Sequence, residues 1–357
     1  MWTTIVKEDL ENIYKSLSEN ELNIFNDKKI LITGYAGSLG YMLLAFFKEF
    51  GKKLKIKKVY GIDNYIFGTP KWLNEFEKDE LFELKNLDIT NCNLEFASEA
   101  KIIFHMASLA SPVYYRLHPI ETIDADVVGL RRLLDFYKNK SIHNLLFFST
   151  SEIYGNPVNE QVPTDEQYWG NVNTSGPRAC YDESKRFGET LCYNFNKVYN
   201  VPITVIRPFN SFGPGLRTND KRVVADFAEN IIKNEEIVIY SDGKATRTFC
   251  YVSDTISGII KCSLHNEYNI FNIGYDKEEI NIDELSKIYR EIGIDLFNYN
   301  KEIIYRVHED KHYLTDNPQR RCPNIDKAKR LLGYFPSINT VEGVRRYIKH
   351  LIEEEEK

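Results

Sequence analysis

Three polar side chains near the middle of the chain have the types and spacing of a proton-transfer group. Tyr181 and Lys185 are four residues apart, so on a helix they lie on one face, one turn apart. Thr150 follows the apolar run 145–148, which predicts a buried strand. A phenol ordinarily loses its proton at about pH 10, and a neighbouring ammonium or a hydroxyl hydrogen bond favours the phenolate. The set could therefore supply a general base near neutral pH, as alcohol oxidation by a nicotinamide requires.

A Tyr-x-x-x-Lys pair alone also fits an ordinary surface pair, so its meaning depends on a nucleotide site upstream. Residues 29–33 predict a strand, and a loop with the spacing G-x-x-G-x-x-G follows at 34–40. A glycine turn before a helix N-terminus offers free N–H groups to a pyrophosphate, although this spacing differs from the general G-x-G-x-x-G fingerprint. Asp63 follows a second strand, 59–62. A carboxylate there can bind both ribose hydroxyls of NAD and would repel a 2′-phosphate.

We therefore expect NAD as the cofactor, with a mere turn as the alternative for the glycine loop. Residues after the third and fourth strands would complete the site, although ordinary loop positions are the alternative for them. The predicted cofactor-binding residues are Gly34, Gly37, Ser38, Leu39, Gly40, Asp63, Asn64, Asp88, Ile89, Ala107, Ser108, Tyr181, Lys185 and Pro208.

The elements that must position these residues alternate between strand and helix from residue 29 to residue 206. This pattern predicts an α/β fold with a doubly wound parallel Rossmann sheet and a smaller substrate lobe rich in C-terminal residues. We expect an NAD-binding domain at 28–207, with 246–274 returning to it, and a substrate lobe at 208–245 and 275–357. Residues 1–27 form a helical extension, because Ile5, Leu10, Ile13, Tyr14 and Leu17 recur at helical spacing. That helix should pack on the domain or on a partner subunit.

Composition restricts the class of protein. The chain has 357 residues, is 43% hydrophobic and carries a net charge of −6, which argues against a nucleic-acid partner. Its six cysteines show no CxxC pair and no disulfide-type spacing, which indicates reduced thiols. No apolar run approaches the roughly 18 residues of a membrane span, and a signal h-region is missing. We expect a cytoplasmic protein with no membrane partner.

One metal-site motif is interpreted as coincidental. His308 and His312 spell H-E-x-x-H, which needs both histidines on a rigid helix face and a further ligand. Here the string follows the strand-like segment 303–307 and leads into Thr-Asp-Asn-Pro at 315–318. We expect no metal.

The glycine loop, Thr150 and the Tyr181–Lys185 pair together resemble an extended short-chain dehydrogenase/reductase. Over residues 29–350 the chain resembles UDP-glucuronic acid decarboxylases (UDP-xylose synthases) in particular. The motifs that carry this resemblance are Ser-Thr-Ser-Glu-Ile-Tyr-Gly at 149–155, Tyr-Trp-Gly-Asn-Val-Asn at 168–173, Gly-Pro-Arg-Ala-Cys-Tyr-Asp-Glu-Ser-Lys at 176–185, Arg-Pro-Phe-Asn-Ser-Phe-Gly-Pro at 207–214, Thr-Arg-Thr-Phe-Cys-Tyr-Val-Ser-Asp at 246–254 and Asn-Pro-Gln-Arg-Arg-Cys-Pro at 317–323.

The resemblance implies that NAD+ takes a hydride from C4 of the sugar while Tyr181 takes the hydroxyl proton. The 4-ketone is then β to the C6 carboxylate, so CO2 can leave into an enolate that hydrogen-bond donors stabilise. Glu152 and Arg321 match residues that serve decarboxylation and reprotonation, and Ser151 matches one that meets the carboxylate. Without the resemblance, Arg321 would be read as a surface arginine beside Arg320, and Glu152 as an ordinary ion-pair partner.

The same resemblance assigns the rest of the substrate site and a partner. The substrate would be a nucleotide-diphosphate sugar, bound by Asn210, Arg222, Arg247, Tyr251 and Arg178. Each of these residues taken alone could instead belong to a solvated face. The helices near 120–139 and 181–199 pair across the dimer in relatives, which implies a homodimer.

Position 151 separates the alternatives. Sugar-nucleotide 4,6-dehydratases carry Asp then Glu after the threonine, whereas this chain has Ser151, which lacks the acidity to expel a hydroxyl. The 4-epimerases usually lack an acid at the place of Glu152. Ser184 and the pair Ser108-Leu109 depart from the decarboxylase pattern of Gly and Cys-Pro. A 4,6-dehydratase, a 4-epimerase and a catalytically idle NAD-binding relative stay open as alternatives.

Overall fold

The computed structural model describes residues 2–355 and is built around a seven-stranded sheet in which every neighbouring pair is parallel. The strand order is β11-β6-β5-β4-β1-β2-β3. The strands are β1 (Lys29–Thr33), β2 (Lys58–Asp63), β3 (Phe82–Asn86), β4 (Ile102–His105), β5 (Asn144–Phe148), β6 (Ile203–Pro208) and β11 (Asn269–Ile273). The order reverses between β1 and β4, which creates a crevice at the carboxyl ends of these strands. The predicted doubly wound Rossmann sheet is confirmed.

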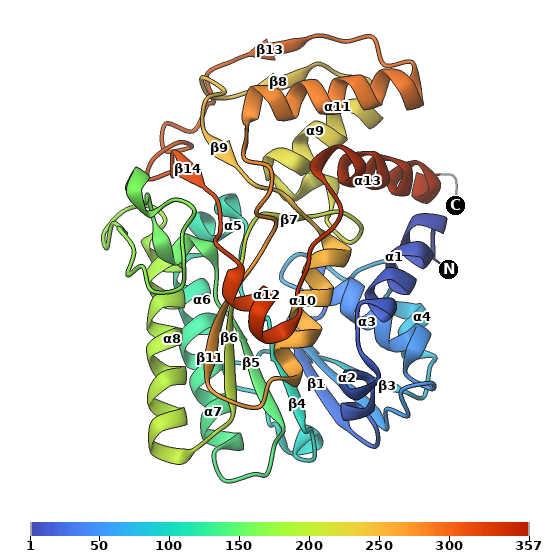
Figure 1. The fold of residues 1–357 in the computed structure, drawn as a ribbon, viewed down its shortest axis with the longest axis vertical. Helices are drawn as coiled ribbons and strands as arrows, with labels where there is room; N and C mark the ends of the chain where they lie inside the picture. The colour runs from blue at the N-terminus through green and yellow to red at the C-terminus, as the bar shows by residue number, and fades with distance from the viewer. Residues whose placement is uncertain (1, 356–357) are drawn as a thin grey trace.

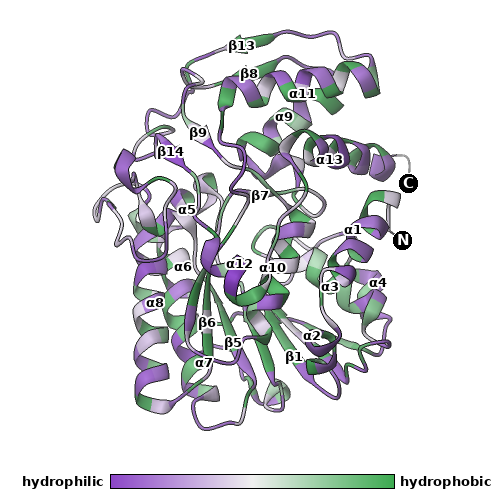
Figure 2. Cartoon of the chain, in the orientation of Figure 1, coloured by the Kyte–Doolittle hydropathy of each residue, from purple (hydrophilic) through white to green (hydrophobic). Residues whose placement is uncertain are grey.

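Alternate side chains of the inner strands enter two different cores. Ile30 and Ile32 of β1 pack with the helices α3 (Ser38–Phe50) and α10 (Val252–Leu264). Leu31 packs on the opposite face with α7 (Leu130–Tyr137) and α8 (Ala179–Tyr199). This alternation is the two-residue period of a strand buried on both faces. Figure 1 shows the two helical layers, and Figure 2 shows the predominantly hydrophobic colour of the strands between them.

The N-terminal extension packs on its own chain. The helix α1 (Thr4–Lys15) lies against α3, α10 and the last helix, α13 (Thr340–Glu355), so the two ends of the chain are neighbours (Figure 1). The helix α2 (Glu19–Ile24) follows with a capping box. Asp9 is fully buried, and it accepts hydrogen bonds from the Tyr251 hydroxyl at 2.7 Å and the Arg346 guanidinium at 2.9 Å. The extension is therefore part of the hydrophobic core.

We expect Asp9→Ala to lower the free energy of unfolding by about 3 kcal/mol, because it leaves the buried Tyr251 hydroxyl without its acceptor and Arg346 with only the exposed carboxylates of Glu8 and Glu342. Denaturant titration followed by circular dichroism measures this loss. The matched control is Glu8→Ala, because Glu8 also pairs with Arg346 but its side chain is 53% exposed. The control should cost less than about 1 kcal/mol. Equal losses in the two variants would contradict the role given to Asp9.

Small sheets and helices form a lobe above the carboxyl edge of the main sheet (Figure 1). Three short sheets pair β8 (Ile237–Ile239) with β13 (Ile303–Tyr305), β7 (Ser211–Phe212) with β10 (Cys250–Tyr251), and β9 (Thr246–Arg247) with both β12 (Ile280–Asn281) and β14 (Arg320–Arg321). The remaining helices are α4 (Leu73–Glu77), α5 (Pro112–Leu117), α6 (Pro119–Ile123), α9 (Val223–Ile232), α11 (Ile282–Phe297) and α12 (Asp326–Leu332). The segment 246–274 supplies β11 to the main sheet and α10 to the helical layer that packs on it.

Candidate active site

A cavity of about 830 Å³ lies at the carboxyl ends of the strands, between the main sheet and the upper lobe. Every catalytic and cofactor-binding residue predicted from the sequence lines it, and so do Asn210, Arg222, Arg247 and Arg178. Tyr251 does not. Its side chain is buried behind the cavity wall against Asp9, so the assignment of Tyr251 to the nucleotide was wrong. The reason is that the Tyr251 hydroxyl donates to Asp9 of the N-terminal extension, a long-range contact that the local sequence does not encode.

The loop after β1 needs glycine because its backbone lies very close to a neighbouring segment. Gly34 has φ +75°, and a Cβ there would lie 2.6 Å from the backbone of Ala107. The carboxylate of Asp63 accepts hydrogen bonds from the N–H groups of Ala36 and Tyr65, both at 2.9 Å. Burial raises the pKa of Asp63 despite these bonds. Asp63 thus holds the loop in shape and stands where the sequence placed a ribose ligand.

Tyr181 and Lys185 lie on one face of α8, as their spacing predicted. The Tyr181 ring is buried and stacks on Tyr115, with ring centroids 5.1 Å apart and planes 6° apart. Lys185 Nζ donates to the carbonyl of Phe148 at 2.9 Å. It also forms an ion pair with the buried carboxylate of Asp126 at 2.9 Å.

The electrostatic surroundings of Tyr181 differ from the expected ones. Burial and the carboxylate of Asp126 raise the pKa of Tyr181 above its ordinary value, and the hydrogen bond with Thr150 only partly offsets them. The sequence interpretation considered Lys185 as an uncompensated ammonium. It missed Asp126 because a lone aspartate within a helical segment carries no local signal, and only the packing of helices brings it to Lys185.

Glu152 is held between two arginines. Its Oε2 accepts a hydrogen bond from Arg178, and Arg321 binds both carboxylate oxygens, with Nη2 at 2.5 Å from Oε2. Burial raises the pKa of Glu152, but Arg178 and Arg321 outweigh it and hold the pKa well below the ordinary range. Glu152 is therefore ionised at neutral pH. It can act as a proton donor only when these arginines bind another anion, because its pKa then rises.

Arg321 lies in the cavity and not on the outer surface. The strand β14 pairs with β9, and adjacent side chains of a strand point to opposite sides. Arg321 consequently faces Glu152 with 5% of its area exposed. Arg320 points away and pairs with Glu279 at 2.7 Å. The structure excludes the surface-arginine alternative for position 321.

A third guanidinium adds to the positive charge. Arg247 donates to the carbonyls of Thr246, Gln319 and Pro318 and so fixes the segment that carries Arg321. Burial and the neighbouring Arg321 lower the pKa of Arg247 to about 9. Two carboxylates face these three arginines, Glu152 and Asp182, whose Oδ2 lies 3.6 Å from Arg178 Nε. Burial and Glu152 raise the pKa of Asp182 to about 7, so an excess of positive charge remains at this end of the cavity.

The residues assigned to the diphosphate line two different parts of the cavity. Arg222 immediately precedes α9 and pairs with Asp220, with Nη2 3.1 Å from Oδ2. Asn210 donates to the carbonyl of Thr248 at 2.9 Å. Both residues line the cavity, and their contact with a diphosphate stays a prediction.

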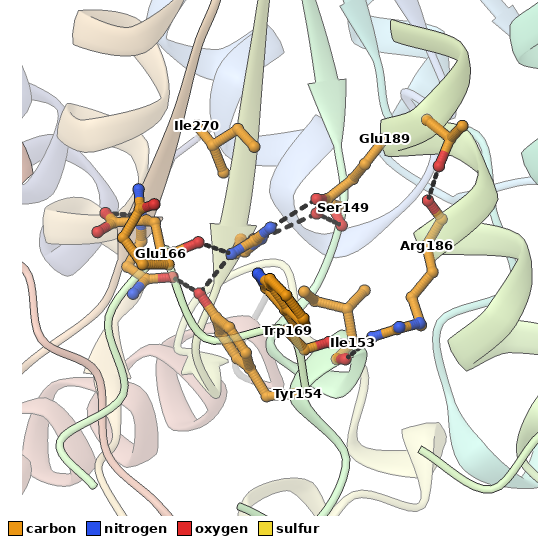
Figure 3. Close-up of polar contacts among 12 residues, drawn as sticks. Ser149, Ile153, Tyr154, Glu166, Trp169, Arg186, Glu189 and Ile270 are labelled. Carbon is orange, nitrogen blue, oxygen red and sulfur yellow. Dashed lines mark hydrogen bonds and ion pairs between the residues drawn. The ribbon is translucent and has the colours of Figure 1, made fainter. Parts of the chain in front are cut away.

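A polar network fixes the loop that carries Thr150, Ser151 and Glu152. Arg207 binds both oxygens of Glu189, at 2.9 and 2.6 Å, and also bonds the Tyr154 hydroxyl at 2.7 Å. Ser149 donates to Glu189 at 2.6 Å. Figure 3 shows Ser149 and Glu189 on one side of this network and Tyr154 on the other. In the same view Arg186 reaches the carbonyls of Ile153 and Trp169. Hydrogen bonds of Ser149 and Tyr154 thus hold the two ends of this loop.

The H-E-x-x-H string lies next to the cavity, whose lining includes its neighbours Tyr240 and Tyr313. His308 lies in irregular chain after β13 and stacks on Tyr313, with ring centroids 4.0 Å apart. Tyr240 meets both rings edge-on. Arg116 of α5 anchors the loop through Asp310 Oδ2, at 2.8 Å. Among residues 2–355, His, Cys, Asp and Glu side chains nowhere gather in a group of three or more that could hold a metal ion.

Residues 30–274 match the NAD-dependent epimerase/dehydratase family. The chain belongs to this family. It is 35% identical to UDP-glucuronic acid decarboxylase 1 of Xenopus tropicalis over 354 residues, which are 98% of this chain and 79% of that protein. It is also 35% identical to UDP-glucuronic acid decarboxylase 3 of Arabidopsis thaliana over 316 residues, 88% of this chain and 86% of that protein.

Solved structures of other proteins share the epimerase/dehydratase fold. A UDP-glucose 4-epimerase from Thermotoga maritima, with UDP-glucose, superposes with a TM-score of 0.78 at 24% identity, covering 92% of this chain and 99% of that one. A UDP-glucuronic acid 4-epimerase from Bacillus cereus, in complex with UDP-glucuronic acid and NAD, superposes with a TM-score of 0.74 at 23% identity, covering 91% and 99%. Within residues 2–355, every helix of this family member is too short or too polar to cross a lipid bilayer.

Proposed function

We propose that this epimerase/dehydratase family member oxidises C4 of a nucleotide-diphosphate sugar with NAD and then removes its C6 carboxyl group. The substrate would be UDP-glucuronate, and the product UDP-xylose or the UDP-4-keto-pentose. The observation that carries this proposal is the group of Arg178, Arg247 and Arg321 around Glu152, in the same cavity as Tyr181.

The excess of buried arginines favours an acidic sugar. Three guanidiniums face Glu152 and Asp182, and the pKa of Asp182 is raised to about 7. The buried positive charge that remains would not be compensated by a neutral hexose, whereas a uronate supplies the missing anion. Arg321 can then exchange part of its bond to Glu152 for the sugar carboxylate. As CO2 leaves, donors in this wall stabilise the electron pair left behind on the 4-keto sugar.

Residues beside this arginine group fit the oxidation step. NAD, when bound, accepts the hydride from C4. Tyr181, hydrogen-bonded to Thr150, takes the proton of the C4 hydroxyl. Ser151 lines the cavity beside them and cannot act as the acid that expels the C6 hydroxyl in a dehydratase. The relatives named above, both UDP-glucuronic acid decarboxylases, support the same choice.

The test is incubation with UDP-glucuronate and NAD+, following CO2, NADH and the sugar product by NMR. We expect CO2 and a UDP-pentose. Formation of UDP-galacturonate without CO2 would show a 4-epimerase instead. Dehydration of a neutral nucleotide hexose would show a dehydratase, and tight NAD binding with no turnover of any nucleotide sugar would show an idle relative.

Asp63 should set a preference for NAD over NADP. We expect Asp63→Asn to reduce the ratio of the NADP to the NAD dissociation constant at least about tenfold. The amide keeps an acceptor for the loop but lacks the charge that repels a 2′-phosphate. Calorimetric titration with both cofactors measures the change. Glu83→Gln, on the neighbouring β3 with a half-exposed side chain, is the control and should leave the preference intact. An unchanged ratio in the Asp63 variant would refute the assignment.

We also propose a homodimer, formed through the helical segments near 120–139 and 181–199, which include parts of α6 and α8. These helices pack against each other, and the apolar side chains of Ile120 and Phe187 on them are 64% and 50% exposed. We expect the double variant Ile120→Asp, Phe187→Asp to halve the mass measured by light scattering after gel filtration. Phe335→Asp, at an equally exposed apolar site beyond α12, should not. A monomeric wild-type protein would contradict the proposal.

A further inference from the structure

A buried asparagine joins the two chain segments that carry Glu152 and Arg321. Asn272 belongs to β11, an edge strand of the main sheet, and its side chain is completely buried. Its Oδ1 accepts a hydrogen bond from the Tyr154 hydroxyl at 2.8 Å (Figure 3), and Tyr154 lies two residues after Glu152. Its Nδ2 donates to the carbonyl of Asn324 at 3.1 Å, three residues after Arg321. One amide group therefore contacts both segments.

The same amide holds the second segment through Thr164 as well. Asn272 Nδ2 also donates to the carbonyl of Thr164 at 2.9 Å. The backbone of Thr164 in turn pairs with the chain that follows Arg321. Its N–H donates to the carbonyl of Cys322, and its carbonyl accepts from the N–H of Asn324, both at 2.8 Å. The backbone next to Arg321 is thus held by Asn272 both directly and through Thr164.

Asn272 itself is fixed by contacts on two sides of β11. In the register of the parallel strands it stands opposite Arg207 of β6, and Arg207 also donates to the Tyr154 hydroxyl at 2.7 Å. On the free edge of β11, the N–H of Asn272 donates to the Glu166 carboxylate at 2.8 Å. The amide oxygen and both hydrogens of the amide nitrogen have partners. A buried amide bonded in this way holds one orientation, because any other leaves polar atoms unpaired.

We propose that Asn272 is a positioning residue, which holds Glu152 and Arg321 in the mutual geometry that loss of CO2 requires. This proposal rests on the proposed function and deepens it, because Glu152 and Arg321 serve its second step. They are 169 residues apart, and they lie in a single 3-10 turn and in a two-residue strand. Neither Asn272 nor Tyr154 lines the cavity, so both act on the sugar only through the residues that they position.

The contacts of Asn272 separate the second step from the first. Thr150, which bonds the base of the oxidation step, lies at the other end of the loop beside Ser149. The Ser149 hydroxyl donates to Glu189 at 2.6 Å, a contact that involves no atom of Asn272. Loss of the contacts of Asn272 should therefore disturb the ion pair of the second step while Thr150 keeps its place. A displacement of about 1 Å can cost as much as about 100-fold in rate.

The first test is Tyr154→Phe, which removes only the hydroxyl between the loop and Asn272. In a single turnover of UDP-glucuronate with NAD+, we expect the rate of CO2 release to fall at least about tenfold, with NADH formation within about threefold of wild type. The matched control is Tyr137→Phe, because the buried Tyr137 hydroxyl donates to the carbonyl of Ala97 at 2.7 Å in the opposite core. This control should leave the ratio of the two rates unchanged. An unchanged ratio in Tyr154→Phe would overturn the proposal, because a merely structural hydroxyl affects both steps alike.

The second variant is Asn272→Ala, which removes the links to both segments at once. Its rate of CO2 release should fall further than that of Tyr154→Phe, again with NADH formation less affected. The matched control is Asn144→Ala. Asn144 is equally buried and donates to the carbonyls of Cys262 and His265 at 3.0 and 2.7 Å, but it lies at the start of β5, away from the cavity. A wild-type ratio of the two rates in Asn272→Ala would contradict the positioning role. If this variant does not fold, Tyr154→Phe decides.

A third measurement needs no substrate, so it stands even if UDP-glucuronate is the wrong sugar. Denaturant titration gives the unfolding equilibrium constants of Tyr154→Phe, Arg321→Lys and the double variant. We expect the two effects to depart from multiplicativity by at least about threefold, because a pair already loosened has less to lose. The same cycle with Tyr137→Phe should be multiplicative within about twofold.

The outcomes separate this proposal from the proposed function. Independent effects of Tyr154→Phe and Arg321→Lys on unfolding would refute the positioning role whatever the substrate. Absence of CO2 from the wild-type protein would instead refute the proposed function, and the unfolding cycle then decides whether Asn272 and Tyr154 position Arg321.

Discussion

Tyr181→Phe should reduce NADH formation from the nucleotide sugar at least about 10³-fold, because it removes the group proposed to take the C4 hydroxyl proton. General bases contribute roughly 10²- to 10⁴-fold to such steps. The phenylalanine ring can keep the stacking on Tyr115, so the fold and the NAD affinity should remain within about threefold of wild type. Stopped-flow absorbance at the NADH band, together with calorimetric NAD binding, measures both quantities.

The control for Tyr181→Phe is Tyr193→Phe on the same helix. Tyr193 is 49% exposed and lies three turns away from Tyr181 on α8. Its loss should change the rate less than twofold. Retention of more than about a tenth of the wild-type rate in Tyr181→Phe would show that another group, or water, accepts the proton.

Arg321→Ala should separate the two halves of the reaction. It removes the bidentate partner of Glu152 and one of the three guanidiniums that favour a uronate. Loss of a donor to a developing anion ordinarily costs about 10²- to 10³-fold in rate. We expect CO2 release to fall at least about 100-fold while NAD binding stays unchanged. The specific signature is NADH that accumulates in a single turnover without a matching amount of CO2.

Stability must be controlled in this experiment, because breaking a buried ion pair costs about 3–5 kcal/mol. Arg321→Lys retains a cation with less of that penalty, and it should recover part of the CO2 release if charge at this position matters. The matched control is Arg320→Ala, whose arginine pairs with Glu279 outside the cavity. It should release CO2 within about threefold of wild type. A wild-type rate of CO2 release in Arg321→Ala would remove Arg321 from the mechanism.

The sequence by itself determined the elements whose chemistry is local. The strand 29–33, the glycine loop and the helix after it are contiguous, and Asp63 follows the next strand, so spacing alone predicted the dinucleotide end. Tyr181 and Lys185 share a helix face because the helical period brings i and i+4 together. The apolar strands alternating with helices likewise predicted the parallel sheet, which the structure confirms.

The tertiary structure alone decided what surrounds these groups. Glu152 and Arg321 meet across 169 residues of chain, and the pairing of β14 with β9, which no local period encodes, puts Arg321 into the cavity while Arg320 points out. The hydroxyl of Tyr251 donates to Asp9, which belongs to the N-terminal extension, for which the sequence predicted no chemical role. Asp126 reaches Lys185 only because two helices pack. Spacing specifies which side chains share an element, whereas the charge that each one meets depends on long-range packing.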